Sequence, residues 1–140
     1  MKSKFNILFE QVMDDIELSK KHEELNLPDN KNVSSEMLEE LAENGNVVMR
    51  QEIAKNPNTP TEVLKKLAED KFVWVRYEVA KNPNTPTEVL KKLADDNRWE
   101  VRKGLTYNSS APVEILMKLT EDENGSVRGN AKRQMRHLKQ

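Results

Sequence analysis

The chain contains the same 15 letters twice, AKNPNTPTEVLKKLA at Ala54–Ala68 and again at Ala80–Ala94. The two copies are 26 residues apart, and projecting that offset in both directions finds weaker copies. Four columns of identical residues stay in register: Leu38, Leu64, Leu90 and Leu116; Leu41, Leu67, Leu93 and Leu119; Asn30, Asn56, Asn82 and Asn108; Arg50, Arg76, Arg102 and Arg128. Four units of 26 residues therefore fill about 30–133, which indicates a repeat protein.

Each unit reads as two short helices. In the second unit, the pattern predicts Thr59 as the N-cap, Pro60 at the first helical position and Glu62 as the partner in a capping box. Glu62 and Lys66 are then expected to pair one turn apart. The second helix covers about Phe72–Lys81, because the Asn-Pro that follows cannot continue it.

Helices of about 10 residues with a narrow apolar stripe are marginal alone, so the units must stack to form one core. The sequence therefore predicts an all-α, capped α-solenoid. Residues 1–29 are assigned to an N-terminal amphipathic capping helix and linker, 30–133 to four repeats, and 134–140 to a basic C-terminal helical tail. Together these parts make one structural domain.

The repeat resembles a known family. The residues Asn-Pro-Asn-Thr-Pro-x-Glu-Val-Leu-x-x-Leu-Ala, followed by Val-Arg-x-x-Val-Ala, look like the variant leucine-rich repeat, a relative of HEAT and armadillo repeats. The match is specific in units two and three, but Val33 and Ala111 replace the capping threonine in units one and four. The resemblance implies a right-handed superhelix that serves as an interaction scaffold. One member carries an iron–sulfur cluster on a cysteine-rich segment, which this cysteine-free chain lacks.

Composition excludes several classes of function. The absence of cysteine removes disulfides, thiolate metal sites and cysteine nucleophiles. The charges nearly cancel, with 23 basic against 24 acidic residues, so the chain is not globally basic. No apolar run is long enough to cross a bilayer, and the N-terminus lacks a signal-peptide pattern. We expect a cytoplasmic protein with no membrane partner, and a monomer.

The sequence also lacks the patterns of catalysis. Its two histidines, His22 and His137, lie near opposite ends, and no phosphate-binding glycine loop, nucleophile elbow or zinc-protease motif is present. The chain is therefore predicted not to be an enzyme and to hold no metal or cofactor.

Two sets of columns are interpreted as structural. The arginine column could track phosphates, but an acidic column precedes it, and a ladder of arginine–aspartate pairs between neighbouring repeats is favoured. The asparagines of the turns are expected to bond backbone groups that the prolines leave unpaired. The ladder set is Arg50, Arg76, Arg102, Arg128, Asp70, Asp96, Asp122, Asn56, Asn82 and Asn108.

Recognition is expected where the repeats differ. The remaining aromatic residues concentrate at these variable positions, and aromatic and arginine side chains on one face are typical of interface hot spots. The predicted contacts with a partner protein are Trp74, Tyr77, Trp99, Arg98 and Lys103. Ordinary packing between repeats remains the alternative for the same aromatics.

Nucleic-acid binding is the alternative function. It would use lysine pairs on the first helices together with the basic tail, namely Lys65, Lys66, Lys91, Lys92, Arg128, Arg133, Arg136 and Lys139. Against it, the first unit carries Glu39-Glu40 at the position of the lysine pairs. A third possibility is head-to-tail assembly, because residues 1–49 hold 5 basic and 11 acidic side chains whereas 128–140 hold 5 basic and none acidic.

Overall fold

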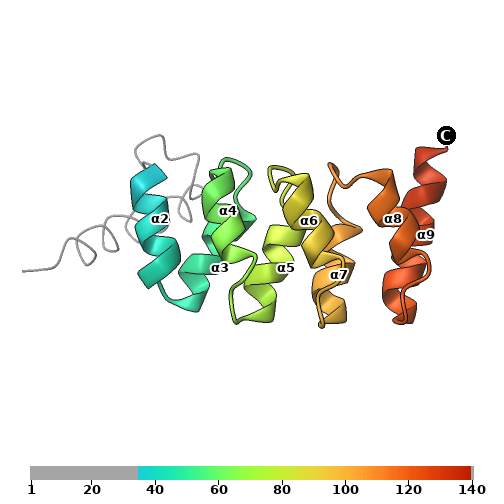
Figure 1. Cartoon of the computed structure of the whole chain (residues 1–140), viewed down its shortest axis with the longest axis horizontal. Helices are drawn as coiled ribbons and strands as arrows, with labels where there is room; N and C mark the ends of the chain where they lie inside the picture. The colour runs from blue at the N-terminus through green and yellow to red at the C-terminus, as the bar shows by residue number, and fades with distance from the viewer. Residues whose placement is uncertain (1–34, 140) are drawn as a thin grey trace, which may run out of the picture.

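A computed structural model describes residues 35–139 of the chain, and within this range the protein is all-α with eight helices (Figure 1). They are α2 (Ser35–Asn44), α3 (Val47–Lys55), α4 (Thr61–Leu67), α5 (Val73–Lys81), α6 (Thr87–Leu93), α7 (Trp99–Leu105), α8 (Val113–Leu119) and α9 (Gly125–Leu138). The predicted capping helix within 1–29 lies outside the described residues. The residues 134–138, assigned to a tail, continue α9 without a break.

The helices follow one another along the long axis in chain order (Figure 1). The second helices of the units pack directly on one another, α3 on α5, α5 on α7 and α7 on α9. Each first helix, α4, α6 or α8, packs on the second helix that follows it. This sequential packing is consistent with helical repeats.

The core lies between the two rows of helices. Val63, Leu64 and Leu67 of α4 are at most 2% exposed, and Val75 and Val79 of α5 are fully buried. These are the apolar stripes that the helical spacing predicts. One hydrophobic cluster extends from Leu38 in α2 to Ala131 in α9, so every described helix contributes to the same core.

Asparagine side chains connect each interhelical turn to the preceding one. The Asn82 amide donates to the main-chain oxygens of Ala54 and Asn56 at 2.8 and 2.7 Å, and its carbonyl accepts from the Asn84 N–H. Asn108 repeats this arrangement one unit later. Because the turn prolines supply no N–H, these amides satisfy carbonyls that would otherwise be buried without donors.

The predicted capping box is wrong. The helix α4 begins at Thr61 with Pro60 as its N-cap, and the Thr59 hydroxyl donates to the Ile53 carbonyl at 2.5 Å instead. Thr59 is fully buried, and the equivalent Thr85 donates to the Val79 carbonyl. Each threonine therefore gives a second hydrogen bond to a carbonyl at the end of the preceding helix, which also accepts from the Asn56 or Asn82 N–H.

Gly104 permits the close packing of α5 on α7. A Cβ atom at Gly104 would lie 3.0 Å from the Tyr77 ring, 3.0 Å from the Tyr77 carbonyl oxygen and 3.1 Å from Ala80 Cβ. The last two atoms cannot move without the α5 backbone. Gly129 in α9 differs, since a Cβ there meets nothing within 4 Å.

We expect Gly129→Ala to raise the free energy of unfolding by about 0.5–1 kcal/mol, because alanine favours a helix interior. Gly104→Ala gains the same propensity but forces α5 and α7 apart, and overpacking costs about 1–3 kcal/mol. The two variants should therefore shift a urea unfolding midpoint in opposite directions. Stabilisation by both would show that the α5–α7 contact adapts freely.

Candidate functional site

Three ion pairs, whose side chains are only 7–14% exposed, join consecutive repeats. In each pair the arginine Nε donates to one carboxylate oxygen at 2.6–2.8 Å, and Nη2 donates to the other at 3.0–3.4 Å. The pairs are Arg50–Asp70, Arg76–Asp96 and Arg102–Asp122. We call this set the arginine ladder. Its bidentate geometry fixes both the distance and the rotation between neighbouring units.

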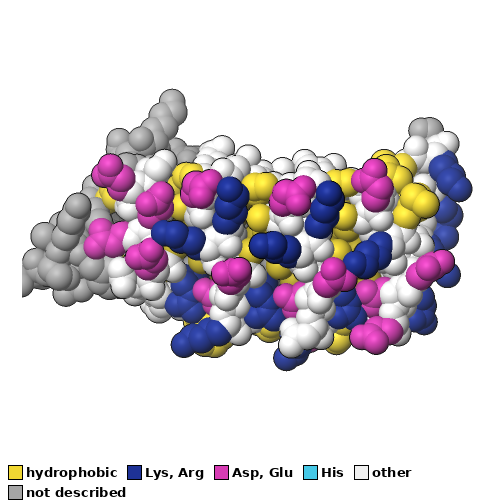
Figure 2. Space-filling model, viewed as in Figure 1, with side chains coloured by type: hydrophobic (Ala, Val, Ile, Leu, Met, Phe, Trp, Pro, Cys, Tyr) yellow, Lys and Arg dark blue, Asp and Glu magenta, His cyan; other side chains and the backbone are white. Residues whose placement is uncertain are grey.

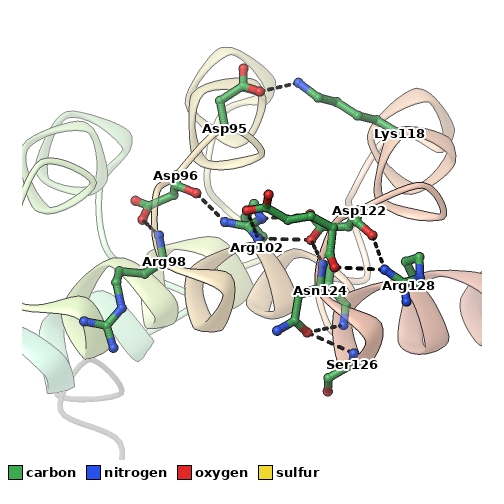
Figure 3. A network of polar contacts seen from close by, with 11 residues as sticks. Asp95, Asp96, Arg98, Arg102, Lys118, Asp122, Asn124, Ser126 and Arg128 are labelled. Carbon is green, nitrogen blue, oxygen red and sulfur yellow. Dashed lines mark hydrogen bonds and ion pairs between the residues drawn. The ribbon is translucent and has the colours of Figure 1, made fainter.

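Each rung is also tied to the backbone. Arg102 Nη1 donates to the Asp96 carbonyl at 2.7 Å, and Arg128 Nη1 donates likewise to the Asp122 carbonyl (Figure 3). The Asp122 carboxylate accepts from the Asn124 N–H as well as from Arg102. An aspartate of the ladder thus receives the arginine of the preceding repeat on its side chain and that of its own repeat on its main chain.

In the last complete rung, Arg102–Asp122, the pKa of the aspartate is lowered. Burial by itself would raise the pKa of Asp122, but the hydrogen bonds from Arg102 and the Asn124 N–H, with the charges of Arg102 and Arg128, bring that pKa below its ordinary value. The side chains of Arg102 and Asp122 are 8% and 7% exposed. Arg102 is the one charged residue in the described range that is buried as a whole. The two charges of this rung are thus satisfied by one another within the protein.

Trp74 and Tyr77 form an aromatic pair on α5, in which Trp74 is exposed and Tyr77 is partly buried. Their rings meet edge to face, with centroids 5.4 Å apart, and Trp74 is 51% exposed. The Lys81 ammonium lies 5.2 Å from the centre of the Tyr77 ring. The pKa of Tyr77 is raised, mainly by burial and further by Glu78 and Tyr107. Tyr77 is therefore held in place, whereas Trp74 presents its ring to solvent.

The other predicted contacts gather at the start of α7. Trp99 is 39% exposed, and Lys103 Nζ lies 5.8 Å from its ring centre. Arg98 pairs with Glu100 at 2.8 Å, so its charge is partly neutralised. No ring contact or ion pair within residues 35–139 links this group to Trp74 and Tyr77. The five predicted residues thus form two groups on neighbouring helices.

Tyr107 is a further exposed aromatic residue, and it is not among the predicted contacts. Its ring is 48% exposed, and its hydroxyl accepts a hydrogen bond from the Asn130 amide of α9 at 2.9 Å. The sequence does mark position 107 as variable between repeats, because Tyr107 replaces the lysine found at positions 55 and 81. Together Trp74, Tyr77 and Tyr107 define what we call the aromatic surface.

The lysine pairs lie among carboxylates on the face of the first helices (Figure 2). Lys65 pairs with Glu62 at 3.0 Å, and Lys66 pairs with Glu43 of the preceding unit at 2.9 Å, so the predicted Glu62–Lys66 pair is wrong. Lys91 contacts Glu88 at 3.4 Å, whereas Lys92 has no ion pair among the described residues. The face alternates in sign and forms no continuous basic track.

A hollow of about 510 Å³ separates α4 from α6. Ala68, Val89 and Leu93 contribute its apolar lining, and Glu69 and Lys92 are among the charged residues around it. It exists because the first helices are spread further apart than the tightly packed second helices. No reactive group is gathered there.

Within residues 35–139, no group of three histidines or carboxylates is placed to hold a metal ion. None of the helices in this range is both long and apolar enough to cross a membrane. Comparison with protein-family models, with curated proteins and with solved structures gave no significant match. The function is therefore argued from the surface itself.

The ladder predicts an acid-sensitive stability. We expect Asp122→Asn to lower the free energy of unfolding by about 3 kcal/mol at neutral pH, because the buried Arg102 loses its bidentate partner and keeps only a 3.6 Å contact with the exposed Glu123. The pKa of Asp122 is depressed on folding, so its contribution is present above about pH 4 and is lost as the pH falls through the folded-state pKa. The difference in the free energy of unfolding between wild type and Asp122→Asn, measured by urea unfolding, should therefore become smaller as the pH falls below about 4.

Glu114→Gln is the matched control, since Glu114 is exposed on α8 and has no ion pair with a described residue. It should lower the free energy of unfolding by at most about 0.5 kcal/mol, because, among the described residues, Glu114 interacts only with the N-terminal end of α8. A difference between wild type and Asp122→Asn that stays constant down to low pH would contradict the assignment of the stabilisation to the ionised carboxylate.

Proposed function

We propose that the protein is a non-catalytic scaffold that binds a partner protein through the aromatic surface of its second helices. The observation that carries the proposal is the exposed ring of Trp74, which meets the partly buried Tyr77 edge to face. Tryptophan and tyrosine dominate the energetics of protein interfaces because they bury a large area with few rotatable bonds. A solvent-facing tryptophan on a well-packed helix is a candidate anchor of that kind.

The rigidity of the support adds to the argument. Tyr77 lies against α7 over Gly104, and α5 is fixed to both neighbouring repeats by the arginine ladder. A surface held in this way loses little conformational entropy when a partner docks. The aromatic side chains are thus presented in nearly their bound arrangement.

The finer architecture belongs to the same proposal. The repeat pattern, with its resemblance to variant leucine-rich repeats, supports an α-solenoid with a right-handed superhelix, an architecture that presents extended surfaces for binding. We take the site of action to be the cytoplasm. Enzyme activity forms no part of the proposal, because the aromatic surface offers no nucleophile with a paired general base.

Capture from a lysate of the source cells, with and without nuclease, tests the proposal. We expect wild type to retain a protein that Trp74→Ala and Tyr77→Ala lose by tenfold or more, since hot-spot residues contribute at least about 2 kcal/mol. Nuclease should have no effect. Recovery that disappears with nuclease would instead support nucleic-acid binding.

Val113→Ala is the matched control, because Val113 is a comparably exposed apolar residue, 48% exposed, on α8. It should retain the partner fully. Circular dichroism must show that the two aromatic variants keep the helical content of wild type. If they fold and retain the partner as well as Val113→Ala does, the aromatic surface is not the binding site.

A further inference from the structure

Arg128 has the setting of a ladder arginine without the aspartate. Its Nη1 donates to the carbonyls of Asp122 and Glu123 at 2.7 and 2.9 Å, as the other arginines bond carbonyls of their own repeats. Its Nε and Nη2 groups donate to no residue between 35 and 139. In the three complete rungs these same two groups hold a carboxylate at 2.6–3.4 Å.

The open edge of Arg128 is held in position. The two carbonyls fix one side of the guanidinium, and Nη2 lies next to Gly125, where a Cβ would be 3.4 Å away. In every complete rung, Nε and Nη2 bond the aspartate of the following repeat. The open edge of Arg128 therefore faces outward from the last repeat, with the geometry for a bidentate acceptor already set.

Arg128 also begins a basic stripe on α9. Lys132, Arg136 and Lys139 follow it at helical spacing, so the four side chains share one face. None of the four makes an ion pair with a residue that the structure describes. Like charges one turn apart repel each other, so the stripe is unfavourable until it meets negative charge. Figure 2 shows basic side chains gathered at this end of the molecule.

A hollow of about 490 Å³ lies beside the stripe, between α8 and α9. Lys132, Arg136 and Lys139 line it together with the apolar side chains of Met117 and Met135. Glu121 is the one carboxylate in its lining. A segment docked here would meet positive charge along the whole length of α9 and a small apolar area within it.

We propose that this end of the array binds an acidic peptide segment of a partner protein, with one carboxylate seated on the Nε–Nη2 edge of Arg128. Further carboxylates pair with Lys132, Arg136 and Lys139. The site is separate from the aromatic surface and independent of the function proposed for it.

We choose a carboxylate as the ligand because the same edge holds an aspartate in all three complete rungs, and the test separates it from a phosphate, which the same fork also binds. A second copy of the chain would not continue the ladder, since the ladder column of its first unit carries Asn44, an amide without charge.

The test uses the full chain with a hexa-aspartate peptide as the probe and hexa-asparagine as its neutral control. In two-dimensional ¹H–¹⁵N NMR spectra, the Nε–H signal of Arg128 should move toward the positions of Arg50, Arg76 and Arg102 as hexa-aspartate is added. Arg128→Lys, which keeps the charge but loses the bidentate edge, assigns the signal. We expect it to weaken binding about five- to tenfold.

Arg136→Lys is the matched control on the same stripe, and it should change the affinity less than twofold because no backbone contact fixes that side chain. Equal weakening by the two variants, or a stationary Arg128 signal at saturating peptide, would overturn the proposal. A 12-nucleotide oligothymidylate that moves the signal at lower concentration and equal salt would establish a phosphate ligand instead. A signal that shifts with protein concentration alone would identify a second copy as the occupant.

Discussion

The buried arginine–aspartate pair between consecutive repeats is the contact on which the rest of the structure depends. Helices of 7 to 10 residues, as in α2–α8, are too short to be stable alone, so their order comes from neighbouring units. Apolar packing favours stacking but is not directional. The bidentate pair, together with the asparagine bonds between turns, supplies the missing direction, because each fixes one repeat at a single rotation against the next.

Much of this arrangement could be predicted from the sequence, because each unit makes the same packing and polar contacts with the same residues. The 26-residue period, the apolar stripes and the all-helical class follow from identical letters at Ala54–Ala68 and Ala80–Ala94. The pairing of Arg76 with Asp96 could be inferred for the same reason. A column of one charge needs a column of the opposite charge if it is to be buried.

The contacts that the sequence does not predict are those in which a side chain has more than one partner of the same chemistry. Thr59 has the spacing of a capping box, yet its hydroxyl bonds the helix behind it, and no local pattern distinguishes the two. Lys66 is one turn from Glu62 but pairs with Glu43 of the preceding unit, while Glu62 pairs with Lys65. The aromatic surface was found only in part, since the contact between Tyr107 and Asn130 joins two units. Such contacts require the geometry between repeats, which a period alone does not give.

The ladder also makes the two ends of the array chemically different. Each rung joins an arginine to the aspartate of the next repeat, so an array of any length has an unused arginine at its C-terminal end unless that residue is replaced. At the other end, Asn44 removes the charge from the aspartate column, whereas Arg128 keeps the guanidinium and the carbonyl bonds that orient it. An uncharged side chain at position 128 would have avoided an unpaired cation. Across the described ladder, the aspartate column therefore loses its charge in the first unit, whereas the arginine column keeps its charge in the fourth.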